Sequence, residues 1–60
     1  MNELTRHNEI VALVNSRGAL KVTDLVDYFA ISPATARRDI TKLDQEGRVQ
    51  KVRNGILKIT

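Results

Sequence analysis

A serine followed by proline, Ser32-Pro33, marks a helix start that constrains the rest of the chain. A hydroxyl side chain at a helix N-cap accepts a hydrogen bond from a free backbone N–H. Proline is tolerated at the next position because its missing N–H has no intrahelical partner there. The apolar residues that follow share one helical face, namely Ala36, Ile40 and Leu43. Because Gly47 favours a helix end, the pattern predicts a helix over residues 33–46.

A shorter helix is predicted immediately before this one. Thr23 is a suitable N-cap residue, and Asp24 is favourable at the positive end of a helix. An apolar stripe follows, made of Leu25, Val26 and Phe29. The helix is predicted over residues 24–30, which leaves a connection of about three residues before the next helix. Two helices joined this tightly are typical of a helix-turn-helix motif.

The N-terminal part of the chain predicts one more helix and a short extended segment. Apolar residues recur there at helical spacing, namely Ile10, Val11, Leu13 and Val14. Gly18 suits the left-handed position that ends many helices, so this helix is predicted over residues 3–17. In the next segment, 19–22, Leu20 and Val22 alternate with a polar residue. Such a short strand needs a partner strand elsewhere in the chain.

Beyond Gly47 the pattern changes from helical to extended. The apolar residues of this region are Val49, Val52, Ile56, Leu57 and Ile59. Asn54-Gly55 lies among them, and Asn-Gly is a strong signal for a two-residue type I′ turn with positive φ at both positions. The pattern predicts a β-hairpin, or wing, over residues 48–60. Segment 19–22 would add a third strand to it.

The predicted fold class is therefore α+β, a small winged helix-turn-helix with three helices and a C-terminal two- or three-stranded β-hairpin wing. A chain of 60 residues can bury one hydrophobic core, so residues 1–60 are expected to form a single domain. The absence of Cys excludes a disulfide framework and thiolate zinc sites. No apolar run approaches the roughly 20 residues that span a bilayer, and the polar N-terminus is unlike a signal peptide. We therefore expect no membrane partner and a cytoplasmic location.

The positive charge of the chain is concentrated in its second half. Residues 32–60 carry seven Lys and Arg against three Asp and Glu, whereas residues 1–31 carry three against four. At about 100° per residue, Ala34, Arg38, Thr41 and Gln45 point away from the core face of the helix over 33–46, with Thr35, Arg37 and Lys42 on its flanks. A helix that enters the major groove of DNA needs small residues near its start and long donors behind them. This basic face therefore favours a double-stranded DNA partner.

The candidate DNA-binding residues lie in two segments. In the helix they are Ser32, Pro33, Ala34, Thr35, Arg37, Arg38, Thr41 and Lys42, and in the hairpin they are Lys51, Arg53 and Asn54. Arg38 is the best candidate for reading a guanine edge, and the flanking donors would hold phosphates. Asp39 is expected to orient a neighbouring Arg or to support the fold. DNA binding would associate the protein with the nucleoid.

Less specific interpretations apply to the same residues. A basic helix face is often only solvated, and Lys on an edge strand protects against aggregation. A winged helix can also bind an acidic protein partner without binding DNA.

His7 is the only His, and without Cys it gives little support for a metal site. We expect no catalytic residue, no metal and no cofactor, and therefore no enzyme.

The chain resembles the DeoR-type bacterial transcriptional repressors over nearly its whole length. The resemblance is carried by the run SPATARRDI at residues 32–40, preceded by Arg6, Ile10 and Val14 at matching spacings. The run KVRNG at 51–55 falls where that family has its wing, and with KLD at 42–44 it is most similar to the ascorbate-utilisation repressor branch. Two departures are Ala36, where the family usually has a larger apolar residue, and Asn54-Gly55, where it usually has two glycines.

The resemblance implies the N-terminal DNA-binding domain of a repressor of carbohydrate-uptake or catabolic genes. It also implies a homo-oligomeric full-length protein whose C-terminal domain binds an effector such as a phosphorylated sugar. Such a domain is not contained in the 60 residues, which are therefore expected to be an excised domain or a small freestanding regulator.

Overall fold

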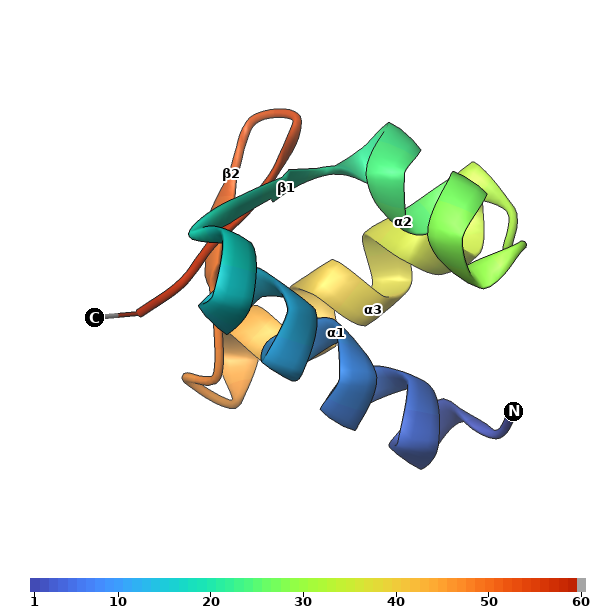
Figure 1. The fold of residues 1–60 in the computed structure, drawn as a ribbon, viewed down its shortest axis with the longest axis horizontal. Helices are drawn as coiled ribbons and strands as arrows, with labels where there is room; N and C mark the ends of the chain where they lie inside the picture. Colours follow the sequence, from blue (N-terminus) through green and yellow to red (C-terminus); the bar gives the residue numbers. More distant parts are fainter. Residues whose placement is uncertain (60) are drawn as a thin grey trace.

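The fold consists of three helices and a three-stranded antiparallel sheet (Figure 1). It is known from a computed structural model that describes residues 1–59. In chain order the elements are α1 (Glu3–Arg17), β1 (Ala19–Lys21), α2 (Val22–Phe29), α3 (Pro33–Gln45), β2 (Gln50–Val52) and β3 (Gly55–Leu57). This architecture confirms the predicted α+β winged helix-turn-helix class. Thr60, the last residue of the predicted wing, lies outside the described residues.

The sheet connects the C-terminal hairpin to the N-terminal half of the chain. Its strand order is β1-β3-β2, so β3 is the central strand and pairs antiparallel with both neighbours. Leu20 of β1 lies opposite Ile56 of β3, and both side chains are buried. The short segment after α1 is therefore the third strand that the sequence predicted, and it anchors the wing to the helices.

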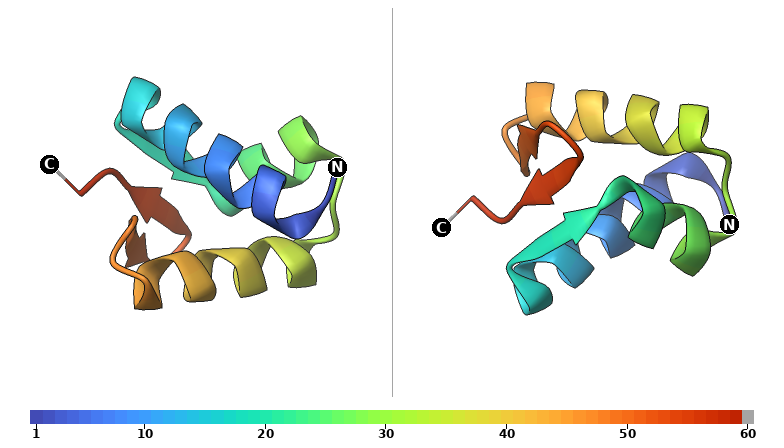
Figure 2. Two further views of the ribbon diagram at one scale, coloured as in Figure 1. Left: turned by 90° about the horizontal axis from the view of Figure 1, so that it is seen from below. Right: turned by 90° about the horizontal axis from the view of Figure 1, so that it is seen from above.

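The core lies between α1 and α3, which run on opposite sides of it with the sheet at one end (Figure 2). Among residues 1–59, nine hydrophobic residues are buried in it, namely Ile10, Val14, Leu20, Leu25, Ala36, Ile40, Leu43, Val49 and Ile56. Every secondary-structure element except β2 contributes to this cluster. No helix within residues 1–59 has the length and hydropathy needed to cross a membrane.

The second helix begins earlier than the sequence predicted. The expected N-cap was Thr23, but Val22 is already helical and Lys21 is the N-cap residue. The backbone N–H of Lys21 donates to Asp24 Oδ2 at 2.8 Å, and that of Val22 donates to the carbonyl oxygen of Asn54 at 2.8 Å. These two bonds give hydrogen-bond acceptors to the backbone N–H groups at the start of the helix. The helix therefore begins at Val22, and the strand ends at Lys21. The helix also ends at Phe29, one residue early, because Ala30 takes a left-handed conformation with φ of 54°.

The turn of the wing differs from the predicted type I′ turn at Asn54-Gly55. Val52 pairs with Gly55, so the two loop residues are Arg53 and Asn54. Neither of them has positive φ. Gly55 belongs to β3, and its backbone lies so close to β1 that an added Cβ would come within 2.0 Å of the carbonyl oxygen of Leu20. Glycine is therefore required there by close strand packing and not by turn geometry.

Candidate nucleic-acid interface

Helix α3 separates a buried apolar face from an exposed basic one. Ala36, Ile40 and Leu43 are buried. The candidate residues on the other side are exposed at Ala34, Arg37, Arg38 and Lys42, and half-buried at Thr41. The three cations therefore carry their charge at the surface of a rigid helix. Such an arrangement can present guanidinium donors to a polyanion.

The start of α3 is built from short side chains. Ser32 is the N-cap, and its Oγ accepts a hydrogen bond from the backbone N–H of Thr35 at 3.1 Å. The same hydroxyl donates to Thr35 Oγ1 at 3.0 Å. Pro33 occupies the first helical turn, as the sequence predicted, and Ala34 beside it is exposed. The first turn of the helix is thus fixed in place and free of bulky side chains.

The base of the wing is held against the middle of α3. Lys51 Nζ donates to Thr41 Oγ1 at 3.2 Å, and the backbone N–H of Lys51 donates to Asp44 Oδ1 at 3.0 Å. Thr41 in turn donates its hydroxyl proton to the carbonyl oxygen of Arg37 at 3.0 Å. These contacts bring candidate residues from the helix and the hairpin together. They also fix the direction in which the wing leaves the helix.

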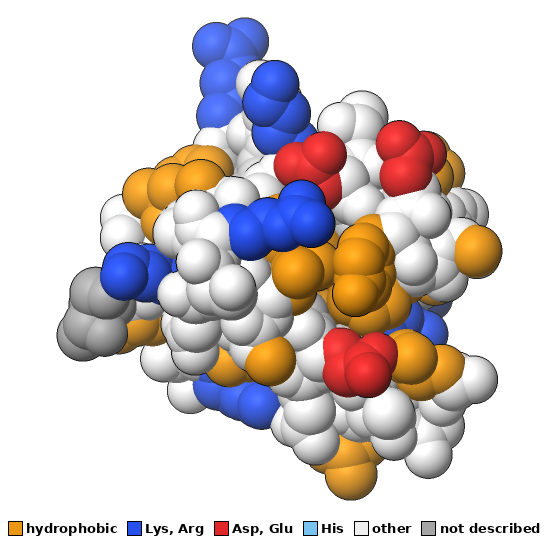
Figure 3. All heavy atoms as spheres, viewed as in Figure 1, with side chains coloured by type: hydrophobic (Ala, Val, Ile, Leu, Met, Phe, Trp, Pro, Cys, Tyr) orange, Lys and Arg blue, Asp and Glu red, His pale blue; other side chains and the backbone are white. Residues whose placement is uncertain are grey.

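The end of the wing carries exposed Arg53 and Asn54. Figure 3 shows Lys and Arg side chains projecting at this end of the molecule, with acidic side chains over the neighbouring part of α2. The charged residues that line a groove between α2, the start of α3 and the turn are Lys21, Arg37 and Arg53, together with Asp27 of α2. Lys21 was not among the predicted site residues, because only the position of β1 beside the wing brings it there.

Within residues 1–59, Lys42 is the one candidate whose positively charged group forms an ion pair. Its Nζ donates to both carboxylate oxygens of Glu3, at 3.0 and 3.2 Å. The hydrogen bond and the positive charge of Lys42 lower the pKa of Glu3. The two residues are far apart in the sequence, and no local pattern marks Glu3 as a neighbour of α3. The predicted interface therefore includes an acidic residue that the sequence did not reveal.

Asp39 lies on the inner side of α3, where it joins this helix to α1. Arg6 donates to its two carboxylate oxygens from Nε at 2.6 Å and from Nη2 at 2.9 Å. His7 Nε2 lies 2.8 Å from Asp39 Oδ1, and both His7 and Asp39 are buried. Burial by itself raises the pKa of Asp39, but the hydrogen bonds and charges of Arg6 and His7 hold that pKa below its ordinary value. Asp39 thus supports the fold and is turned away from the exposed basic face.

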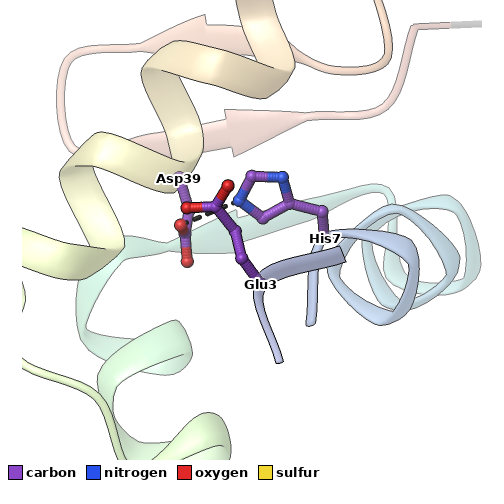
Figure 4. A group of neighbouring side chains, drawn as sticks. All are labelled: Glu3, His7 and Asp39. Atoms are coloured by element: carbon purple, nitrogen blue, oxygen red, sulfur yellow. Dashed lines mark hydrogen bonds and ion pairs between the residues drawn. The ribbon is translucent and has the colours of Figure 1, made fainter. Parts of the chain in front are cut away.

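Glu3, His7 and Asp39 form the one cluster of potential metal ligands found among residues 1–59 (Figure 4). Their ligand atoms lie within 4.8 Å of one another. However, Asp39 is already hydrogen-bonded to Arg6, and Glu3 to Lys42. A divalent cation would have to displace both positive side chains. The arrangement therefore fits an ion-pair network between α1 and α3 better than a metal centre.

Two tightly connected helices, an exposed basic face on the second of them, and a β-hairpin braced against that helix define a winged helix-turn-helix DNA-binding domain. The model of the DeoR-like helix-turn-helix domain matches residues 6–60. The chain belongs to this family, and the relatives that match it are transcriptional regulators by name. The predicted DeoR-type membership is confirmed.

Relatives match the chain over its whole length. It is 47% identical over 60 residues to the HTH-type transcriptional regulator UlaR of Escherichia coli O1:K1 / APEC, and 45% identical to the regulator of the same name in Salmonella arizonae. The chain spans only about a quarter of the length of these relatives, since the match covers 24% of each. No solved structure matches the chain.

Proposed function

We propose that this domain binds duplex DNA sequence-specifically, with α3 in the major groove and the β2–β3 turn on the adjacent backbone or minor groove. The observation that carries this proposal is the basic outer face of α3, to which Lys51 of the wing is attached through Thr41. A helix held in this way can present its side chains to base edges while the wing contacts the flanking backbone.

The residues have distinct roles in this proposal. Arg38 points directly away from the core face and reads a guanine edge through its planar guanidinium. Arg37, Lys42, Ser32 and Thr35 hold phosphates or adjacent bases, and Thr41 lies deeper along the groove. Pro33 and Ala34 allow close approach of the first turn. Lys51, Arg53 and Asn54 provide the contacts of the wing.

The domain is proposed to serve a bacterial repressor of carbohydrate-uptake or catabolic genes, and the ascorbate-utilisation branch is the best candidate. Support comes from the similarity to relatives named HTH-type transcriptional regulator UlaR. The full-length protein would be a cytoplasmic, nucleoid-associated homo-oligomer. Its C-terminal domain would bind an effector such as a phosphorylated sugar. Oligomerisation would place two domains on paired half-sites and raise the affinity through avidity.

The first test is selection of bound fragments from a random duplex library at low salt, followed by titration of the selected site at increasing salt. We expect an enriched sequence motif and a linear fall of log affinity with log salt, with a slope of about −0.9 per contacted phosphate. Salt-sensitive binding without a motif would limit the domain to generic DNA binding. If no duplex is bound at low salt, the DNA proposal is wrong and an acidic protein partner becomes the better candidate.

Replacing Arg38 with Ala is expected to cost about 1–3 kcal/mol of binding free energy on the selected site and little on random-sequence DNA. The reason is that a base-reading contact discriminates among sequences, whereas a phosphate contact does not. Fluorescence anisotropy with both duplexes measures the difference. Lys42→Ala is the matched comparison, since it should weaken binding to both duplexes alike. Equal losses for Arg38→Ala on the two duplexes would remove Arg38 from the base-reading role.

A further inference from the structure

Lys42 already has a partner that competes with any phosphate it would bind. Its Nζ lies 3.0 and 3.2 Å from the carboxylate oxygens of Glu3, the first residue of α1. The side chains of Lys42 and Glu3 are 49% and 54% exposed. The pair therefore lies at the surface, where DNA docked on α3 could reach it.

Glu3 carries a negative charge at neutral pH, as an ordinary glutamate does. Its hydrogen bond to Lys42 and the charge of Lys42 lower its pKa further and outweigh burial and the Asp39 carboxylate, which raise that pKa. The other basic side chains near Glu3 are Arg6 and His7, and both are engaged with the buried carboxylate of Asp39. Within residues 1–59, Lys42 is thus the one cation that forms an ion pair with the Glu3 carboxylate.

We propose that Glu3 limits the DNA affinity of the domain by competing with a backbone phosphate for Lys42. The inference rests on the proposed function, because it assigns to Lys42 a phosphate contact. An exposed ion pair contributes little to stability, so exchange of the carboxylate for a phosphate is nearly balanced. The displaced carboxylate then remains close to the DNA backbone and repels it. Both effects weaken binding and require no contact between Glu3 and a base.

Glu3→Gln removes this charge while it keeps the shape of the side chain. We expect the variant to bind a short random-sequence duplex about two- to fivefold more tightly than the wild-type chain at low salt. The gain should shrink as added salt screens the charges. Fluorescence anisotropy with the 60-residue chain measures both quantities. Because the effect acts through a phosphate contact, it should be the same on a selected site.

Two controls separate the route through Lys42 from a general charge effect. Glu9→Gln removes the same charge from an exposed residue of α1 that takes part in none of the ion pairs among residues 1–59. It should change the affinity less than Glu3→Gln. In the Lys42→Met background, adding Glu3→Gln should produce only the small gain seen with Glu9→Gln. Thermal melting verifies that each variant is folded, and Glu3→Ala serves as a second variant with higher helix propensity.

The possible outcomes separate this inference from the proposed function. Tighter binding that depends on Lys42 supports the inference. Unchanged or weaker binding by Glu3→Gln and Glu3→Ala, with a wild-type chain that binds duplex DNA, overturns the inference alone. A gain that persists in full without Lys42 overturns the route through that residue. If the wild-type chain binds no duplex at low salt, the proposed function fails and the inference fails with it.

Discussion

Replacing Asp39 with Ala is expected to destabilise the domain by about 3–5 kcal/mol, because the change leaves the half-buried Arg6 and the buried His7 without their shared carboxylate. The free energy of unfolding of a domain of this size is only about 3–9 kcal/mol in total. The expected loss is therefore at least about a third of the total stability. Urea denaturation followed by circular dichroism measures the loss.

The matched control for this change is Asp27→Ala on α2. Asp27 is also a helical aspartate, but it is exposed and takes part in none of the ion pairs among residues 1–59. Its removal should change the free energy of unfolding by less than about 0.5 kcal/mol. If Asp39→Ala were as stable as Asp27→Ala, the ion pairs of Asp39 would not hold α1 against α3.

The same ion pairs should make stability depend on pH. The pKa of Asp39 is lower in the folded protein than its ordinary value, which is also its value in the unfolded chain. The stabilisation is therefore fully present above that ordinary value, about 3.9, and is lost as the pH falls toward the folded-state pKa. Asp39→Asn should be less stable than wild type at neutral pH and should lose less stability on acidification. If acidification reduced the stability of wild type and Asp39→Asn equally, Asp39 would not be the source of the pH dependence.

Replacing Gly55 with Ala should disrupt the attachment of the wing. A Cβ at this position would lie 2.0 Å from the carbonyl oxygen of Leu20 and 2.9 Å from the Cα of Lys21, and both are backbone atoms that cannot rotate away. β1 and β3 must then separate, at a cost of about 3 kcal/mol or more, which is the upper part of the range for overpacked sites. Urea denaturation measures the loss of stability.

Hydrogen exchange shows whether the loss arises at the sheet. The amides of Val22 and Lys58 donate to Asn54 and Gly18 across the junction of β1 with the hairpin, and both should lose protection in Gly55→Ala. Gly47→Ala is the comparison, since open space surrounds Gly47 and its substitution strains only a backbone with φ of 74°. That variant should keep both amides protected. Retained protection in Gly55→Ala would contradict the role assigned to this glycine.

Features that depend on neighbouring residues could be predicted from the sequence. The start of α3 follows from the Ser32 hydroxyl and from Pro33, which act within one helical turn. The outward direction of Arg38 follows from the apolar spacing of Ala36, Ile40 and Leu43. The third strand was also expected, because Leu20 lies in an extended segment too short to stand alone.

Features that depend on distant residues could not be predicted in this way. The start of α2 is set partly by the carbonyl oxygen of Asn54, which reaches Val22 only after the wing has folded. Asn-Gly favours a turn and therefore predicts Gly55 in one, but the close approach of β1 decides that Gly55 lies in β3. The pairing of Glu3 with Lys42 likewise arises from the packing of α1 on α3 and leaves no local pattern.

An amide chemical-shift titration of the isotope-labelled domain with a random-sequence duplex at low salt tests the central claim most directly. Non-specific binding uses the same phosphate contacts as specific binding, so no operator sequence is needed. We expect the perturbed amides to cluster on the outer face of α3, around Arg37, Arg38 and Thr41, and in the β2–β3 turn at Arg53 and Asn54. Perturbations centred instead on the α1–α2 side, around exposed Tyr28, would contradict the proposed interface.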